Sequence, residues 1–171
     1  APEVADLGGA HFHLIGHLQS NKARKAAEIF HTIQTIDSVK LAQRLDGMIA
    51  PGGGALDVMI EVKLSEEDAK HGAAPEDVPA IAESLRTCKN LRLTGLMTMP
   101  PWSDNAELSR PYFARLRELA ARESLTGLSM GMSNDLEVAI EEGATMIRVG
   151  TAIFGKRPKP VASAPAPPPN L

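Results

Sequence analysis

The sequence lacks several features that would mark a secreted, membrane or nucleic-acid-binding protein. Its one cysteine, Cys88, excludes an intrachain disulfide and suits a reducing compartment. No apolar run approaches the roughly 18 residues of a membrane span. A net charge of -3 gives no electrostatic reason to expect nucleic acid or an anionic membrane as a partner. The first ten residues, APEVADLGGA, lack the basic start and apolar stretch of a signal peptide, so a cytoplasmic protein is predicted.

Short apolar runs alternate with amphipathic segments along the 171 residues, which suffice for one domain. The predicted strands are His11–Gly16, Thr32–Ile36, Asp57–Leu64, Leu91–Met99, Gly127–Met130 and Thr145–Val149. The predicted helices are Asn21–Phe30, Ser38–Met48, Glu76–Thr87, Pro111–Ala121 and Asp135–Glu142. This repeated order indicates an α/β fold with a parallel sheet, in which ligands bind at the carboxyl ends of the strands. Residues 1–158 are assigned to the domain and the Pro/Ala-rich residues 159–171 to a disordered tail.

Cap residues and charged strand residues refine this prediction. Four helices are expected to be capped at their start, by Ser20 or Asn21, by Asp37 or Ser38, by Ser109, and by Ser133 or Asn134, and Gly143 is expected just after a helix end. Glu61 and Arg148 lie inside predicted strands, where an open sheet covered by helices would be apolar throughout. Charges at these positions fit a barrel whose polar lumen holds a ligand.

Two neighbouring strand ends carry small and hydroxyl residues, at Gly131–Asn134 and Gly150–Thr151. Their backbone N–H groups, with the hydroxyls of Ser133 and Thr151, suit one bound phosphate, and glycine lets the backbone approach closely. In barrels such a site often follows the last two strands, at the start of a short extra helix. Ordinary capping and a simple turn explain the same residues, so the local pattern leaves both readings open.

Arg148 and the histidines of HFHLIGH each have two interpretations. Arg148 either pairs with Glu61 across the sheet or contacts a ligand's phosphate or ring nitrogen, because a buried guanidinium needs a partner. His11, His13 and His17 alternate along one predicted strand, as zinc ligands can. No carboxylate or cysteine nearby completes a set, so structural roles are favoured and no metal site is predicted.

Five stretches together resemble the pyridoxal phosphate homeostasis protein family, relatives of the alanine racemase barrel. They are HLIGHLQSNK (His13–Lys22), TIDSVKLAQRL (Thr35–Leu45), LRLTGLMTMP (Leu91–Pro100), LSMGMSND (Leu128–Asp135) and IRVGTAIFG (Ile147–Gly155). The last two are the most specific.

The resemblance implies an eight-stranded (β/α) barrel that holds pyridoxal 5′-phosphate (PLP) at the strand ends without catalysing a reaction. It implies that Met132, Ser133, Gly150 and Thr151 cradle the phosphate and that Arg148 lies by the pyridine nitrogen. An arginine there keeps the nitrogen unprotonated and weakens the ring as an electron sink, which suits a carrier in vitamin B6 homeostasis. PLP-dependent apoenzymes would be its recipients.

One departure from the family concerns its first two strands. The Ala-Val-Ser-Lys-type motif, whose lysine forms the Schiff base, and the following Gly-Glu-Asn motif do not occur, and the ten residues before His11 cannot supply them. The prediction is therefore a (β/α)8-type barrel missing its first two strands. Lys63 is the one candidate found to replace the missing lysine.

Three other functions remain open. A racemase or decarboxylase of this barrel type would normally bring a second β domain and a catalytic tyrosine, whereas the sole tyrosine, Tyr112, falls in a predicted helix. An unrelated phosphate-binding barrel enzyme would use Asp37 or Glu61 as general base. The chain is alternatively an inactive remnant.

Overall fold

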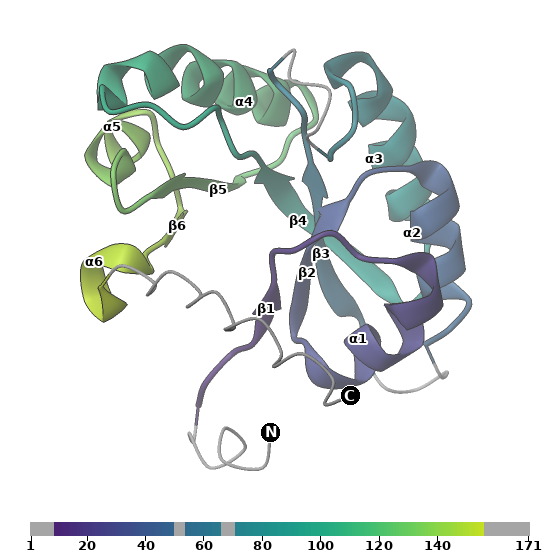
Figure 1. Cartoon of the computed structure of the whole chain (residues 1–171). Coiled ribbons are helices and arrows are strands. Elements are labelled where there is room, and N and C mark those ends of the chain that lie inside the picture. The colour runs from purple at the N-terminus through teal and green to yellow at the C-terminus, as the bar shows by residue number, and fades with distance from the viewer. Residues whose placement is uncertain (1–8, 50–53, 66–70, 156–171) are drawn as a thin grey trace, which may run out of the picture.

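Six parallel strands form one curled sheet in the computed structural model, which describes residues 9–49, 54–65 and 71–155. Each strand pairs with the next one along the chain, in the order β1-β2-β3-β4-β5-β6 (Figure 1). The strands are β1 (His13–Leu14), β2 (Thr32–Ile36), β3 (Leu56–Glu61), β4 (Leu91–Met97), β5 (Gly127–Met132) and β6 (Met146–Arg148). Strictly sequential parallel pairing confirms the predicted βα repeat and gives a partial barrel with β1 and β6 as its edges.

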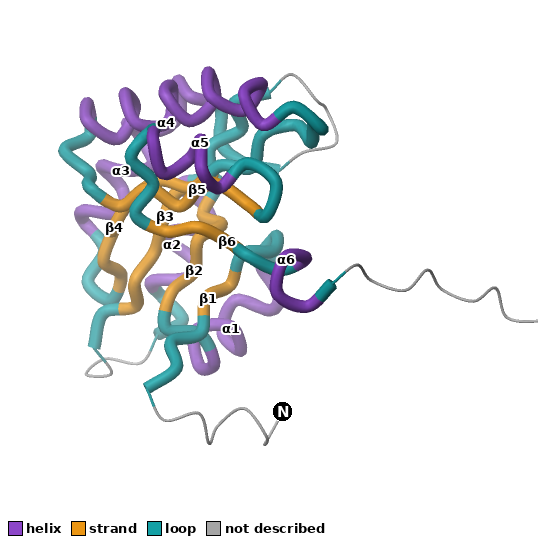
Figure 2. The backbone as a smooth tube through the Cα atoms, turned by 90° about the vertical axis from the view of Figure 1, so that its left-hand side faces the viewer, coloured by secondary structure: helices purple, strands orange, loops and turns teal. Residues whose placement is uncertain are grey.

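All of the helices listed next, except the last, cover the outer, convex face of the sheet (Figures 1 and 2). They are α1 (Ala23–Ile29), α2 (Val39–Asp46), α3 (Val78–Thr87), α4 (Arg110–Arg122), α5 (Leu136–Glu141) and α6 (Thr151–Phe154). Short 3-10 turns precede three of them, at η2 (Ser20–Lys22), η3 (Pro75–Asp77) and η4 (Ala106–Ser109). The four-residue α6 lies apart from this outer layer, beside β6 (Figure 2).

The alternation of β3 divides its side chains between the helix-covered core and the concave face, called the lumen below. Val58 and Ile60 are fully buried in the hydrophobic cluster shared with the helices, where Phe113 of α4 is also fully buried. Met59 and Glu61 are almost as buried, at 2% and 4% exposure, but lie outside that cluster. Successive strand residues point to opposite faces, so Met59 and Glu61 line the lumen, as the sequence predicts.

Two facing glycines let β4 and β5 approach closely. A Cβ on Gly95 would overlap the carbonyl oxygen of Gly127, and one on Gly127 would overlap the carbonyl oxygen of Thr94. The two strands pair in register from Gly95 with Gly127 to Met97 with Ser129. Side chains at this level of the sheet would therefore separate the strands.

Several predicted boundaries and caps are corrected. β1 covers two residues instead of the six expected, and β3 ends at Glu61 instead of Leu64. Of Asp37 and Ser38, Ser38 caps α2, accepting a hydrogen bond from the Leu41 N–H at 3.3 Å. Neither Ser20 nor Asn21 caps α1, which starts at Ala23 after a 3-10 turn. Neither Ser133 nor Asn134 caps α5, because the chain forms a turn there and the helix starts only at Leu136, after Asp135.

Other helix ends differ in how they are stabilised. Ser109 precedes α4 without a side-chain cap; its hydroxyl donates instead to Asp135 at 2.8 Å. Gly143 follows α5 with a φ of 92°, as expected of a residue just past a helix end.

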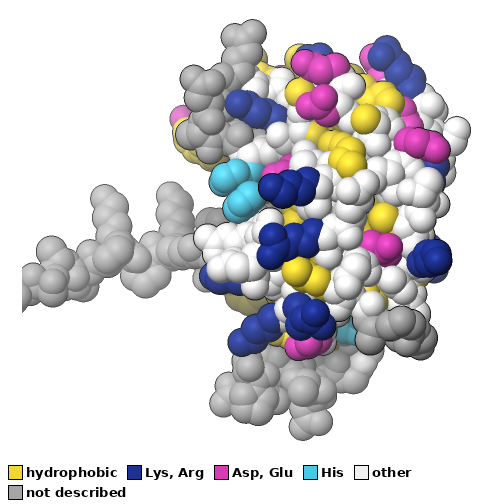
Figure 3. Space-filling view, turned by 90° about the vertical axis from the view of Figure 1, so that its right-hand side faces the viewer, with side chains coloured by type: hydrophobic (Ala, Val, Ile, Leu, Met, Phe, Trp, Pro, Cys, Tyr) yellow, Lys and Arg dark blue, Asp and Glu magenta, His cyan; other side chains and the backbone are white. Residues whose placement is uncertain are grey.

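Basic and acidic side chains both occur on the face seen in Figure 3, with several basic ones along its left-hand part. Among the described residues, no helix has the length and apolar character needed to traverse a bilayer. The predicted tail, residues 159–171, lies outside the described residues.

Candidate functional site

The two strand-end corners singled out in the sequence meet in the structure. Ser133 follows β5, and its hydroxyl oxygen accepts a hydrogen bond from the Ala152 N–H in the first turn of α6 at 3.2 Å. Gly150 and Thr151, between β6 and this turn, are exposed, and a Cβ on Gly150 would meet no atom within 4 Å. The two corners are therefore in contact, and their exposed hydroxyl and backbone groups are called the cup below. The use of the cup for phosphate remains a prediction.

Met132, which the family resemblance also assigns to the phosphate, lies beside these corners, and that role stays a prediction. Its N–H donates to a carboxylate oxygen of Asp135 at 2.7 Å, so this N–H is already engaged, while its side chain is 44% exposed. The other oxygen of Asp135 accepts from Ser109 at 2.8 Å. Both oxygens of Asp135 therefore have donors, which reduces the repulsion that this carboxylate would exert on an anion in the cup.

Gly131 sets the path of the chain into this corner. Its φ is +90°, and a Cβ there would lie 2.5 Å from the Cβ of Ala139 in α5. Both observations require glycine, because other residues are strained at such φ values and no space exists for a side chain. The corner and α5 are consequently held close together.

Arg148 extends from β6 into the lumen and is held at both ends of its guanidinium. Nη1 donates to the Ser129 hydroxyl at 2.7 Å and Nη2 to the Thr98 carbonyl at 2.8 Å. Nε is buried without a hydrogen-bond partner among the described residues. A buried donor without an acceptor costs about 1–3 kcal/mol, so this atom has a free-energy reason to take an acceptor from a ligand.

Of the two interpretations of Arg148, the ion pair with Glu61 does not form within the described residues. Their charges still interact at longer range. Burial, followed by the charge of Asp37, raises the pKa of Glu61 to about 7, and Arg148 partly opposes this rise. Burial lowers the pKa of Arg148, opposed by Asp135 and Glu61.

Gln34 and Ser129 are lumen residues that sequence reasoning missed. Both have no exposed surface, and the Ser129 hydroxyl donates to the Gln34 side-chain oxygen at 2.6 Å. They come from β2 and β5, which are not neighbours in the sheet, so the contact crosses the lumen. The available signal was polar residues inside TIQTI and LSMGM, two otherwise apolar strands.

The histidines of HFHLIGH do not converge. The ring of His11 lies 4.9 Å from that of His31, His13 faces Gln34, and His17 stacks on His71 at 3.9 Å. No group of three possible metal ligands occurs among the described residues. The shared strand face predicted for these histidines is wrong, because β1 is only two residues long.

Lys63 follows β3 and is half-buried, and its N–H donates to the Ala73 carbonyl at 2.9 Å. This contact fixes its backbone beyond the last residue of the strand. A covalent role for its side chain stays a prediction.

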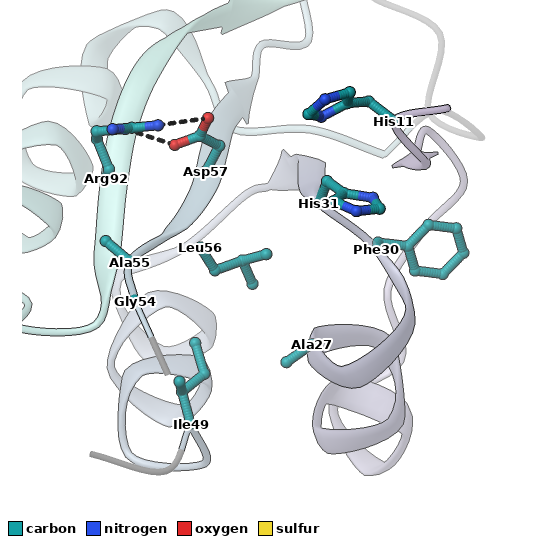
Figure 4. A pocket seen from close by; sticks show the side chains of 10 residues that line it. All are labelled: His11, Ala27, Phe30, His31, Ile49, Gly54, Ala55, Leu56, Asp57 and Arg92. Atoms are coloured by element: carbon teal, nitrogen blue, oxygen red, sulfur yellow. Dashed lines mark hydrogen bonds and ion pairs between the residues drawn. The ribbon is translucent and has the colours of Figure 1, made fainter. Parts of the chain in front are cut away.

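A cavity of about 320 Å³ lies at the opposite, amino-terminal ends of the strands (Figure 4). Its polar groups include the Arg92 guanidinium, which donates to both oxygens of Asp57 at 2.6 and 2.9 Å. His31 also contributes, but its Nδ1 accepts from the Phe12 N–H at 3.0 Å. Asp57 and Arg92 therefore satisfy each other, and among the described residues that line this cavity none has a buried side-chain atom without a hydrogen-bond partner.

Comparison with known proteins places the chain in a family. The profile of the alanine racemase N-terminal domain matches residues 1–158. The pyridoxal phosphate homeostasis protein of Pseudomonas aeruginosa is 48% identical over 157 residues, which are 91% of this chain and 68% of that protein. The chain belongs to the pyridoxal phosphate homeostasis protein family. The family's protein from Aquifex aeolicus is 42% identical over 152 residues, covering 85% of this chain and 67% of its own length.

Solved structures agree with this assignment. PipY of Synechococcus elongatus without PLP superposes with a TM-score of 0.84 at 41% identity, over 90% of this chain and 75% of that one. PipY with PLP bound gives 0.82 at 40% identity, over 90% and 74%. An alanine racemase of Clostridium difficile shares the fold alone, with a TM-score of 0.68 at 16% identity over 93% of this chain and 43% of that one. The chain spans about two thirds of the length of the curated relatives.

Proposed function

We propose that this chain is a non-catalytic PLP-binding protein of vitamin B6 homeostasis, acting in the cytoplasm and passing PLP to PLP-dependent apoenzymes. The observation that carries the proposal is the buried, unpartnered Nε of Arg148 in the lumen behind the Ser133–Thr151 corners. PLP combines a phosphate with a ring nitrogen that can accept a hydrogen bond, so one ligand would use both features. A PLP-bound relative, PipY, supports the choice of ligand.

The phosphate would lie in the cup formed by Ser133, Gly150 and Thr151, with Met132 at its border. The Ser133 oxygen already accepts from the Ala152 N–H, so its own proton is left to donate to a phosphate oxygen. Thr151 offers a second hydroxyl, and Gly150 lets the backbone approach closely. These donors suit an anion, and the charge of Arg148 deeper in the lumen adds to the attraction.

Arg148 determines what the bound cofactor can do. PLP supplies an electron sink, whose strength depends on protonation of its ring nitrogen. A guanidinium is a donor only and remains charged at all physiological pH values, so Arg148 would donate to an unprotonated nitrogen and disfavour its protonation. This arrangement favours holding the cofactor over using it in strong carbanion chemistry.

The test is retention of PLP by the purified full chain, followed by the absorbance of the bound ligand after gel filtration. Ser133→Ala combined with Thr151→Val removes both hydroxyls and is expected to weaken retention about tenfold or more. Ser20→Ala with Thr87→Val removes two exposed hydroxyls elsewhere and serves as the control. Equal retention by both double variants would reject the phosphate site.

One observation favours an enzyme instead: Glu61 is a buried lumen carboxyl whose pKa is raised to about 7, as in many general acids and bases. Racemisation of alanine by the PLP-loaded protein, lost in Glu61→Gln, would establish this alternative. The carrier proposal expects no turnover by either protein.

A further inference from the structure

Four side chains form a hydrogen-bonded chain across the lumen, here called the cross-lumen chain. Arg148 of β6 donates to Ser129 of β5 at 2.7 Å, and Ser129 donates to the Gln34 side-chain oxygen of β2 at 2.6 Å. The Gln34 side-chain nitrogen lies 3.0 Å from Nδ1 of His13 in β1. The chain thus joins the two edge strands through the interior of the curled sheet, although β1 and β6 are not paired in the sheet.

The chemistry of the side chains decides which one donates and which one accepts in each hydrogen bond of the cross-lumen chain. A guanidinium can only donate, so the Ser129 oxygen accepts from Arg148 and must use its single proton on Gln34. This fixes the Gln34 amide with its nitrogen toward His13 and the sulfur of Met146, which lies at 2.9 Å. Burial lowers the pKa of His13, so its ring stays neutral and Nδ1 can accept. The donor and the acceptor in each hydrogen bond of the cross-lumen chain are therefore fixed as long as Arg148 is present.

These contacts fix the direction in which the Nε–H bond of Arg148 points. Ser129 holds Nη1 and the Thr98 carbonyl holds Nη2, and because the guanidinium is planar these two contacts also orient the N–H of Nε. Nε is the one nitrogen of the group without a partner among the described residues. Ser129 accordingly selects which nitrogen of Arg148 remains for a ligand.

We propose that Ser129 and Gln34 are positioning residues that fix Arg148 so that its Nε is the donor to the ring nitrogen of PLP. This rests on the proposed function of PLP binding. Ser129 and Gln34 act through Arg148 and do not touch the ligand. Their loss should therefore weaken recognition of the ring nitrogen and leave the grip on the phosphate unchanged.

Two ligands distinguish this role from general support of the fold: PLP itself and its 1-deaza analogue, in which C–H replaces the ring nitrogen. Both are titrated against the 171-residue chain, with binding followed by absorbance. Ser129→Ala is expected to weaken PLP binding about tenfold, the loss of one buried hydrogen bond, and to leave the affinity for the deaza analogue unchanged. Ser129→Thr keeps the hydroxyl and should restore the preference for PLP. Ser84→Ala, which removes a hydroxyl from the outer helix α3, is the control.

Gln34→Met removes the amide with little change in length and gives the same readout if Ser129→Ala fails to fold. An equal loss of both ligands in the variants would show a merely structural role and overturn the proposal. Unchanged binding of PLP would overturn it as well. If the wild-type chain binds neither ligand, the proposed function is rejected, and this inference is rejected with it. That outcome is seen with the wild type alone, so it can be told apart from a failure of the positioning role, which only the variants reveal.

Discussion

Replacing Glu61 by glutamine isolates one buried carboxyl group in the lumen. The side chain of Glu61 is 4% exposed, and burial together with the charge of Asp37 raises its pKa from 4.5 to about 7. The folded protein therefore holds this proton more tightly than the unfolded chain does. Its contribution to stability is fully present below pH 4.5 and is lost as the pH rises through about 7.

The size of the effect follows from the difference between the two pKa values. At about 1.36 kcal/mol for each pH unit, the rise from 4.5 to about 7 corresponds to about 3 kcal/mol of unfolding free energy. Most of this loss falls between pH 5 and 8. Glutamine has nearly the same shape and cannot ionise, so Glu61→Gln should be close to wild type in stability at pH 5. At pH 8 it should be more stable by roughly 2 to 3 kcal/mol.

The assay is urea unfolding of both proteins at pH values from 5 to 8. With urea m-values of about 1–3 kcal/mol/M, the midpoint of Glu61→Gln should exceed that of the wild type by about 1 M or more at pH 8. Glu28→Gln, on the exposed surface of α1, controls for the general effect of removing a negative charge. A difference between wild type and Glu61→Gln that stays constant from pH 5 to 8 would refute the assignment of a raised pKa.

Two further predictions concern stability. Gly131→Ala should lower the free energy of unfolding in urea by about 2 to 4 kcal/mol, because its positive φ and its closeness to Ala139 both oppose a Cβ. Gly47→Ala is the control and should be near neutral, because Gly47 has a φ of -70° and its nearest neighbour lies at 3.6 Å. A neutral Gly131→Ala would contradict the geometry of this corner. Glu142→Gln should cost about 1 kcal/mol at low salt and less at high salt, because Glu142 is 12% exposed and pairs with two arginines of α4 at 3.0 and 2.5 Å. Glu118→Gln, which removes an exposed carboxylate from α4, is its control, and a salt-independent loss would exclude the ionic explanation.

The sequence predicted the order and type of the strands because periodicity and burial act locally. In β2 every residue is buried, and β3 separates Val58 from Met59 across the sheet, as alternation requires. Ends of elements were less predictable, since β1 keeps only the two residues that pair with β2 at Thr32 and Ile33. Pairing with a neighbouring strand decided this boundary, and no local pattern encodes it.

In the candidate site, too, some features could be predicted from the sequence and others depend on how the sheet folds. The meeting of the Ser133 and Thr151 corners follows from parallel strands that end on the same side, which the βα repeat implies. The partners of Arg148 could not be predicted, because Ser129 and Gln34 are 95 residues apart and meet only once the sheet has curled. Ser133, one of two residues expected to cap α5, instead accepts from the Ala152 N–H in the first turn of α6, a contact that depends on the position of β6.

The facing glycines of β4 and β5 restrict which substitutions this part of the sheet can accept. The atoms that would collide with a new Cβ at Gly95 or Gly127 belong to the backbone, which no mutation can make smaller. A second-site change at either position cannot compensate for a change at the other, because both residues already have no side chain. In a library randomised at both codons and selected for soluble protein, each position should therefore return to glycine independently of the other.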